Sequence, residues 1–295
     1  MVSFRLIART ARRFIHNIMD FGKVTAHARD NVVGQKLLLH KYSFMQAGQR
    51  LPFRDVGFSI YSQHDEDGIL LYLLARIGFE THRSVEICAG NGIECNTANL
   101  LLNHRCTGLL IDGSPSNIAT ARAFYQSRKE TMYWPPDIVE SWLTRDNINE
   151  VISKAGYEGT IDLLSLDVDG MDYWFWKELN VVSPRLVVLE YNHLLGPMAS
   201  LTVPYSPNFV AEFSEYGSDY AGASLRAFVN LGRQKGYRFV GTNTIGTNAF
   251  FVRNDIPSEL VPEAAIEDAF KHPRAKFGMT VRYEKIKHKA WVDAE

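Results

Sequence analysis

The sequence predicts an α/β protein with a doubly wound, Rossmann-like sheet, a C-terminal antiparallel hairpin and an N-terminal helical extension. Short apolar runs alternate with amphipathic segments across residues 56–255, which is typical of parallel strands joined by crossover helices. A glycine-containing turn separates one such run from the helix that follows it. Near the end of this region, the adjacent apolar runs 237–242 and 248–254 predict the hairpin.

Bulk composition narrows the class of protein. The 295 residues are 46% hydrophobic, enough for a substantial core. Lys and Arg number 32 against 33 for Asp and Glu, so we expect no nucleic-acid partner. The three cysteines form no C-x-x-C pair, which argues against a disulfide framework or a structural zinc site. The cysteine usage and the lack of a signal-peptide pattern predict a reducing compartment, so we expect a cytoplasmic protein, and no apolar run reaches the ~18–20 residues of a membrane span.

The N-terminal extension, residues 1–55, is basic and helical in pattern. Four cations and no acid precede Asp20: Arg5, Arg9, Arg12 and Arg13. Apolar residues recur there at helical spacing. This pattern fits a membrane-surface helix, an organelle-targeting peptide, or a helix packed on its own domain or on another subunit. We therefore predict a peripheral membrane contact or a subunit contact, the latter including a homo-oligomer.

Start and stop signals define the elements of the central domain, residues 56–255. The predicted helices are 65–79, 92–104, 115–127, 144–156, 172–179 and 223–236. The predicted strands before the hairpin are 83–89, 107–113, 160–170 and 185–192. Gly78 closes the first helix, and Ser114 followed by Pro115 begins the third. Thr144 is a plausible cap and Gly156 a stop for the fourth.

Two segments are less regular. Residues 193–222 are rich in proline and aromatic residues, so they suit either an acceptor pocket or a long loop that buries its rings. The C-terminal segment, residues 256–295, predicts one helix at 259–270 and a basic, irregular end. The aromatic clusters 133–137 and 173–176 are predicted to pack in the core or between helices.

The stretch 84–114 combines a strand, a glycine turn, a helix, a second strand and an acid. Gly90 and Gly92 remove side chains where a ligand approaches the backbone, and free amides at the following helix start favour an anion. Asp112 lies 20 residues after Gly92, at the carboxyl end of the second strand. A carboxylate there can accept hydrogen bonds from both hydroxyls of a ribose.

Two cofactor classes use this arrangement. A nicotinamide site would have a third small residue in the turn, where this chain has Cys95. The turn from Glu86 to Gly92 instead resembles the E/D-x-G-x-G-x-G motif of class I S-adenosylmethionine-dependent methyltransferases, with Cys88 in place of the first glycine. The hairpin also matches that fold, whose last strand inserts antiparallel into the sheet.

Over residues 58–254 the chain looks closest to the FkbM-like branch of these methyltransferases. The blocks that carry the resemblance are SQHDEDGIL, VEICAGNG, LLSLDVDG and VLEYN. The resemblance implies a Rossmann-like methyltransferase sheet that binds S-adenosylmethionine. The implied cofactor-binding residues are Ser62, Gln63, Glu86, Gly90, Asn91, Gly92, Asp112, Gly113 and Asp167.

The resemblance also implies roles for two segments. Residues 141–147 would flank the adenine. The block around Ser62, Gln63 and Asp65 resembles a lid over the cofactor; alternatively, Ser62 and Asp65 cap the helix that follows, and both roles can hold together.

Polar residues follow two neighbouring strands at the edge where such sheets bind ligands. Asp167, Asp169, Glu190 and Asn192 could together hold a magnesium or calcium ion. Several sugar O-methyltransferases use such a metal to bind adjacent hydroxyls. The alternative is that Asp167 faces the amino group of the cofactor's methionine while Asp169 caps helix 172–179.

Methyl transfer to a hydroxyl also needs a base. His193 follows directly after the second strand and is one candidate, and Asp169 is the other. We predict S-adenosylmethionine-dependent O-methylation of a sugar or another hydroxyl-bearing small metabolite or glycan, with Mg²⁺ as a second cofactor only if the four residues above hold a metal. The alternatives are an NAD-dependent oxidoreductase and a non-catalytic Rossmann-like binding subunit.

Overall fold

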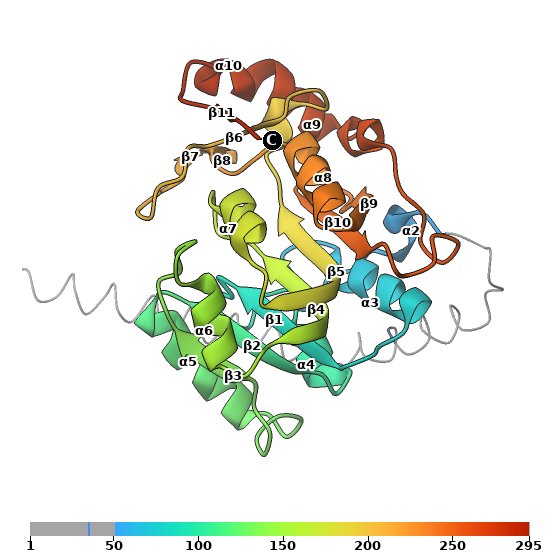
Figure 1. Ribbon diagram of the computed structural model, residues 1–295, viewed down its shortest axis with the longest axis vertical. Coiled ribbons are helices and arrows are strands. Elements are labelled where there is room, and N and C mark those ends of the chain that lie inside the picture. Colours follow the sequence, from blue (N-terminus) through green and yellow to red (C-terminus); the bar gives the residue numbers. More distant parts are fainter. Residues whose placement is uncertain (1–34, 36–50, 295) are drawn as a thin grey trace, which may run out of the picture. The chain divides into compact units, whose positions relative to one another are not determined.

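The computed structural model describes residues 35 and 51–294 of the chain (Figure 1). The chain divides into two units, Met1–Met45 and Gln46–Glu295, and the second is described below. The predicted basic helix at the N-terminus lies outside the described residues. Within the described part, every helix is too short or too polar to cross a bilayer.

Within residues 51–294, seven strands form the central sheet. In spatial order they are β3 (Asp137–Glu140), β2 (Thr107–Asp112), β1 (Arg83–Ile87), β4 (Gly159–Leu166), β5 (Val182–Glu190), β10 (Asn248–Arg253) and β9 (Tyr237–Thr242). The first five are parallel, and β10 lies antiparallel between β5 and β9. This order confirms the predicted doubly wound sheet with a C-terminal antiparallel hairpin.

Helices and short strands surround this sheet. The α-helices are α2 (Phe53–Val56), α3 (Glu66–Ile77), α4 (Ala98–Asn103), α5 (Pro115–Ser127), α6 (Ile148–Lys154), α7 (Asp172–Glu178), α8 (Leu225–Gln234), α9 (Pro273–Phe277) and α10 (Tyr283–Ile286). The single turns are η1 (His193–Leu195), η2 (Ile266–Phe270) and the π-helical η3 (Gly278–Arg282). The short strands are β6 (Leu201–Thr202), β7 (Glu212–Ser214), β8 (Gly217–Tyr220) and β11 (Val292–Asp293).

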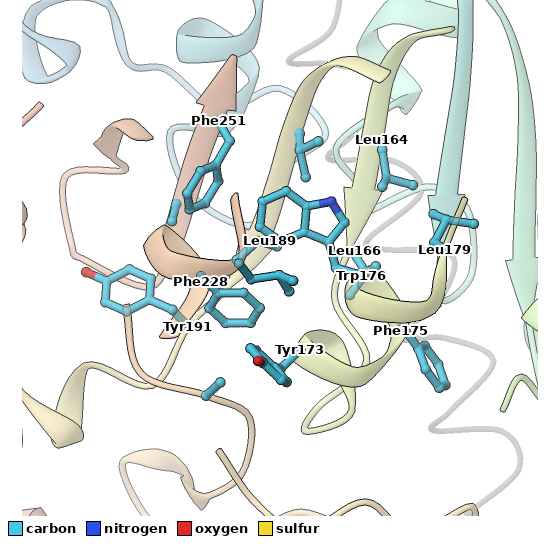
Figure 2. Close-up of a cluster of buried hydrophobic side chains, with 14 of the residues drawn as sticks. Leu164, Leu166, Tyr173, Phe175, Trp176, Leu179, Leu189, Tyr191, Phe228 and Phe251 are labelled. Atoms are coloured by element: carbon cyan, nitrogen blue, oxygen red, sulfur yellow. The ribbon is translucent and has the colours of Figure 1, made fainter. Parts of the chain in front are cut away.

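The main core lies where α7 and α8 pack against β4, β5 and β10 (Figure 2). Trp176 lies at its centre, with its ring centroid 5.0 Å from that of Phe251 and 6.3 Å from that of Phe228. Such aromatic contacts supply much of the apolar burial in a core of this size. The prediction that the aromatic residues at 173–176 pack between elements is confirmed for Tyr173, Phe175 and Trp176.

Strand register brings four chain positions to one edge of the sheet. Ile87 is opposite both Ile111 and Leu166, and Leu166 is opposite Leu189. The residues that follow these pairs are therefore neighbours at the carboxyl edge. They are Cys88, Asp112, Asp167 and Glu190.

Three local predictions are wrong. The helix predicted from Gly92 begins only at Ala98, because residues 89–97 form turns. The helix predicted at 259–270 is reduced to the turn η2, since the chain before it extends along β9, where the Ala264 amide donates to Phe239. The basic end, predicted to be irregular, forms α9, η3 and α10.

The aromatic cluster at 133–137 also differs from its prediction. Tyr133 is 85% exposed and Trp134 is 79% exposed. Their loop is nevertheless ordered by local bonds, because the Trp134 amide donates to the carbonyl of Thr131, whose hydroxyl donates to Tyr125. These rings are a surface feature and not part of the core.

Candidate functional site

A cavity of about 510 Å³ opens at the carboxyl edge of the sheet. It lies beside the ends of β1, β2, β3 and β4 and is bordered by residues 206–211. Open α/β sheets bind their ligands at this edge. The cavity collects five of the predicted site residues, Gly90, Asp112, Gly113, Asp167 and Asp169, and also residues 141–143 of the predicted adenine segment.

The turn after β1 has an unusual backbone. Cys88, Gly90 and Gly92 have φ of 59°, 57° and 67°. Cys88 thus keeps the left-handed conformation that glycine would adopt without strain, at a cost of roughly 1–2 kcal/mol for a residue with a Cβ. A Cβ on Gly90 would meet no atom within 4 Å, whereas one on Gly92 would lie 2.9 Å from Ala121. Gly90 therefore leaves room for a ligand, and Gly92 serves helix packing.

Most amides of this turn are engaged and not free as predicted. The Gly90 amide donates to Asp112 at 2.9 Å, and the Gly92 amide donates to the carbonyl of Ala89. Asn91 is exposed, and its side chain accepts from the amides of residues 93 and 94. Asn91 therefore shapes the turn and does not line the cavity. The turn offers no ready anion site of the kind that binds a pyrophosphate.

Glu86 also has a role different from its predicted one. Its carboxylate is buried and accepts the Asn96 amide and the Ser165 hydroxyl on one oxygen. The other oxygen accepts both the amide and the hydroxyl of Thr97. Four protein donors occupy the acceptor positions of the carboxylate. Glu86 therefore holds the start of α4 against the sheet, and its predicted contact with the cofactor is corrected to a structural one.

Asp112 lies inside the cavity wall and is bound more loosely. One carboxylate oxygen accepts the Gly90 amide; the other accepts the Ser114 amide and the Asn117 side chain, at 2.8 and 3.0 Å. Three of its roughly four acceptor positions are used, so one remains for a ligand hydroxyl. Asp112 was predicted to accept from two ribose hydroxyls. While it keeps its three protein hydrogen bonds, it can accept from one.

Trp142 and residues 206–211 form the outer wall. A Cβ on Gly113 would lie 3.0 Å from the Trp142 ring, so the absence of a side chain lets this ring approach β2. The Trp142 indole donates to the carbonyl of Pro207 at 2.9 Å, and Phe209 packs against Gly170. Trp142 remains 61% exposed and can flank a flat ring bound in the cavity. The pattern of residues 193–222 indicated a pocket but could not locate Phe209 within it.

The predicted lid block lies outside this cavity. Ser62 is buried, and its hydroxyl accepts the Asp67 amide in the first turn of α3, so the alternative interpretation as a helix cap applies to it. Asp65 instead accepts from Thr244. Gln63 is exposed and does not line this cavity. One oxygen of Asp67 gathers the amides of residues 60–62, and burial raises the pKa of this acid to about 6.

Three of the four predicted metal ligands converge. Oxygen atoms of Asp167, Asp169 and Glu190 all lie within 4.8 Å of one another. None of them receives a hydrogen bond from residues 51–294, although each follows or ends a strand of the sheet. Asp169 reaches this position with a left-handed φ of 50° and not by continuing β4, as the sequence had suggested.

Asn192 does not join the three acids. Its buried side chain accepts the Leu194 amide and donates to the carbonyls of Asp219 and Ala221. Both of its N–H groups are used and its oxygen caps η1, so the side chain is held away from a role as metal ligand. Asp172, which the sequence analysis did not single out, accepts the amides of Val168 and Gly170 and so shapes the loop that carries Asp169. The alternative in which Asp169 caps α7 is therefore wrong.

Burial, and to a lesser extent the crowding of like charges, raises the pKa values of the acids at this edge. Desolvation and the charges of Asp172 and Asp169 raise the pKa of Asp167 well above its usual value, although the side chain opens on the cavity. Burial and the charge of Asp167 raise the pKa of Glu190, against the opposing effect of Arg274. Burial raises the pKa of Asp169 as well. Such a cluster favours a bound positive charge.

His193, the first candidate base, is not at this cavity. Its ring is buried beside a separate cavity of about 30 Å³, and a Cβ on Gly278 would lie 2.8 Å from it. Burial and the nearby Arg274 and Arg282 lower the pKa of His193 to about 4. Its Nε2 is buried without a hydrogen bond to any described residue. Without access to the larger cavity, His193 cannot act as the base there.

Solved structures with a similar arrangement of elements are methyltransferases. PKMT2 from Rickettsia typhi in complex with AdoHcy has a TM-score of 0.44 and 12% identity, with 72% of this chain and 57% of that chain covered. The methyltransferase domain of bacterial CtHen1-C has a TM-score of 0.42 and 15% identity, covering 64% and 97%. Magnesium protoporphyrin IX methyltransferase from Synechocystis PCC 6803 with bound SAM has a TM-score of 0.39 and 12% identity, covering 64% and 77%.

No protein-family model matches the chain, and no curated protein matches it in sequence. At these low identities and TM-scores, function has to be inferred from the residues of the site itself.

Proposed function

We propose that the chain is an S-adenosylmethionine-dependent methyltransferase that acts on a hydroxyl of a sugar or another small hydroxyl-bearing acceptor. The charge of the cavity carries this proposal. Among the described residues that line it, three are acids, Asp112, Asp167 and Asp169, and none is Lys or Arg. S-Adenosylmethionine brings a sulfonium and an ammonium group, so its positive charges suit such a wall.

The same charge disfavours a nicotinamide dinucleotide. Its pyrophosphate needs bare backbone amides or cations. Here the amides of the turn donate to Asn91, Glu86 and Asp112. A dianion placed beside Asp112 and Asp167 would also be repelled. Both features favour S-adenosylmethionine over a nicotinamide dinucleotide at this cavity.

The cavity residues fit the parts of the methyl donor. Asp112 retains one acceptor position for a ribose hydroxyl, and Trp142 offers its ring to the adenine. Open space beside Gly90 admits the nucleoside close to the backbone. Asp167 is placed to accept from the ammonium group of the methionine portion. When bound, the cofactor supplies an activated methyl group, so this chain has chiefly to align the acceptor and accept a proton.

Asp169 is the base that the geometry supports. It lines the cavity, and burial raises its pKa, which makes its carboxylate a better proton acceptor than an ordinary aspartate. Its left-handed backbone is the kind of local strain that is common at functional sites. Asp169 would take the proton of the acceptor hydroxyl on one carboxylate oxygen.

Alternatively, Asp167, Asp169 and Glu190 hold a divalent cation, in which case Asp169 is a ligand and not the base, and Asp167 does not bind the ammonium group. Three carboxylates without protein donors match the hard oxygen ligands that Mg²⁺ prefers. Such an ion would bind the acceptor's oxygens and lower the pKa of one hydroxyl. The chain's own part is to present the three carboxylates, with Asp172 holding the loop that carries Asp169.

Calorimetry of the full chain tests the cofactor assignment. We expect S-adenosylhomocysteine to bind and NAD not to bind. Trp142→Ala should weaken S-adenosylhomocysteine binding about tenfold, as one stacking contact is lost. Trp134→Ala is the matched control, since Trp134 is more exposed and lies outside the cavity, and it should change nothing. Binding of NAD instead, or binding of neither ligand, would refute the assignment.

Asp112→Ala gives a second measurement. Loss of this acceptor should weaken binding by ~1.5–3 kcal/mol, because a charged hydrogen-bond acceptor disappears from a partly buried site. Circular dichroism of the variant checks that the turn it supports remains folded. Transfer of label from a tritiated methyl donor to hydroxyl-bearing acceptors then separates an enzyme from a binding subunit.

A further inference from the structure

The C-terminal segment 271–289 has a charge unlike the rest of the chain. It contains seven Lys or Arg residues and one acid, Glu284, in a protein whose formal net charge is −1. The structure folds this segment into the consecutive turns α9, η3 and α10 (Figure 1). A surface helix with an excess of cations is a feature of membrane-binding and other anion-binding elements.

One face of this helical segment is anchored to the domain. Ala275, Gly278, Arg282 and Ile286 are buried, at spacings of three and four residues. Arg282 pairs with the buried Asp219 at 2.7 Å. The segment is therefore held in a fixed orientation, and its opposite face is directed to solvent.

That opposite face carries apolar side chains in water. Phe277 is 37% exposed and Val281 is 45% exposed, four residues apart. Tyr216, from the β7–β8 turn, is 45% exposed and packs edge-on against Phe277 with 5.3 Å between ring centroids. Together Tyr216, Phe277 and Val281 form an exposed patch, which we call the C-terminal patch. Exposed apolar clusters of this kind mark interaction surfaces.

Cations flank the C-terminal patch. Lys285 lies over the Tyr216 ring, 5.9 Å from its centroid, and Lys276 is exposed beside Phe277. Neither lysine forms an ion pair with any residue in the described part of the chain, whereas Lys287 pairs with Glu284 and Lys289 with Glu212. Glu215, next to Tyr216, is the nearest acid in sequence to the patch. The two free lysines leave a positive margin around the apolar centre.

We propose that the C-terminal patch docks on a lipid bilayer with anionic headgroups. Phe277, Val281 and Tyr216 would enter the interface while Lys276 and Lys285 contact the headgroups. Aromatic and aliphatic side chains flanked by lysines on a helix surface are the composition of interfacial elements. The patch residues line neither the cofactor cavity nor the small cavity beside His193, so this surface is separate from the proposed active site.

A second exposed cluster provides a contrast. Tyr133 and Trp134 are more exposed than any residue of the C-terminal patch. Their surroundings, residues 128–140, contain two cations and three acids. They lack the positive charge that attracts anionic lipid, so the same apolar chemistry there is not expected to bind it.

Vesicle flotation with the full chain tests the proposal. We expect binding to vesicles of phosphatidylcholine with about one third phosphatidylserine, and weak binding to phosphatidylcholine alone. Lys276→Gln with Lys285→Gln should reduce partitioning about 25-fold, at about fivefold per lysine. Phe277→Ser with Val281→Ser should reduce it about tenfold. Tyr133→Ser with Trp134→Ser is the matched control and should leave it unchanged.

Three outcomes would overturn the proposal. One is equal binding by the wild type and both C-terminal patch variants. Another is loss of binding only in Arg9→Gln with Arg12→Gln, which would assign it to the N-terminal basic segment. The third is capture of an acidic peptide or nucleic acid that depends on Lys276 and Lys285 while vesicles are not bound. Thermal unfolding of each variant checks that it is folded; the substituted side chains are exposed, so little change is expected.

Discussion

The acids at the two halves of the same sheet edge contrast sharply. Beside β1 and β2, Glu86 and Asp112 accept hydrogen bonds from backbone amides and polar side chains. Beside β4 and β5, Asp167 and Glu190 accept none from the described residues. A carboxylate whose acceptor positions are all occupied by protein donors stabilises the folded state. A cluster of carboxylates without such donors raises the free energy of the folded state. The second set is therefore best explained by a ligand that brings positive charge.

The difference arises from the chain that follows each strand. After β1 the chain turns back through residues 89–97 and aims its amides at Glu86. After β4 it passes directly into α7, where Asp172 accepts the amides of Val168 and Gly170. These two amides of the loop after β4 therefore donate to Asp172 and not to Asp167. The loop satisfies one acid and leaves its neighbours free.

The largest expected loss of stability is at Glu86, whose carboxylate accepts four protein donors. Glu86→Gln replaces an acceptor of four donors by an amide that must direct its NH₂ group at some of them. Loss of charge-assisted bonds in a buried site should reduce the free energy of unfolding by about 3–4 kcal/mol. Chemical denaturation measures this. Glu94→Gln, an exposed neighbour in the same turn, is the control and should change stability little.

The sequence predicts the fold better than it predicts which acids are hydrogen-bonded by the protein. Hydrophobic periodicity and turn signals predicted the sheet, its hairpin and the edge where Asp112, Asp167 and Asp169 meet, because these depend on local spacing. The same signals could not distinguish Glu86 from Asp167, since both occur near the end of an apolar strand. Which acid is saturated depends on loop geometry, and so does the burial of His193 under η3.

Asn192 tests whether a predicted metal ligand at this edge is instead structural. If it bound a metal, Asn192→Asp would strengthen that site. The structure instead uses its amide to donate to Asp219 and Ala221, so an aspartate would face two carbonyls without a donor. We expect a loss of about 2–3 kcal/mol of stability that added Mg²⁺ does not restore. A stabilised variant that binds Mg²⁺ more tightly would place Asn192 among the ligands after all.

Asp67 is intermediate between the two kinds of acid. One oxygen accepts three amides, while the other is buried without a partner in the described structure. Burial raises its pKa to about 6. The folded state therefore holds the proton more tightly than the unfolded state, whose value is near 4. Stability from this group is present below about pH 4 and is lost as the pH rises through about 6.

The size of this effect is on the order of 2 kcal/mol between these limits. Denaturation curves collected from about pH 4 to pH 7 measure it. Asp67→Asn resembles the protonated acid, so it should lose this part of the pH dependence and be more stable than the wild type above about pH 6. An unchanged pH profile in that variant would show that other acids, among them Asp172, account for the slope.

The smallest expected change in stability is an increase, at Asp169. Asp169→Asn removes one charge from the unsaturated acids and places asparagine, the non-glycine residue best suited to left-handed φ, at a φ of 50°. We expect the folded state to gain about 0.5–1 kcal/mol at neutral pH; the gain is small because the partly desolvated side chain still opens on the cavity. The wild type should gain stability on addition of Mg²⁺ and the variant should gain less, which thermal unfolding with and without the ion compares. A variant less stable than the wild type in the absence of Mg²⁺ would mean that Asp169 supports the fold, and the distinction between the two halves of the edge would fail at its most exposed acid.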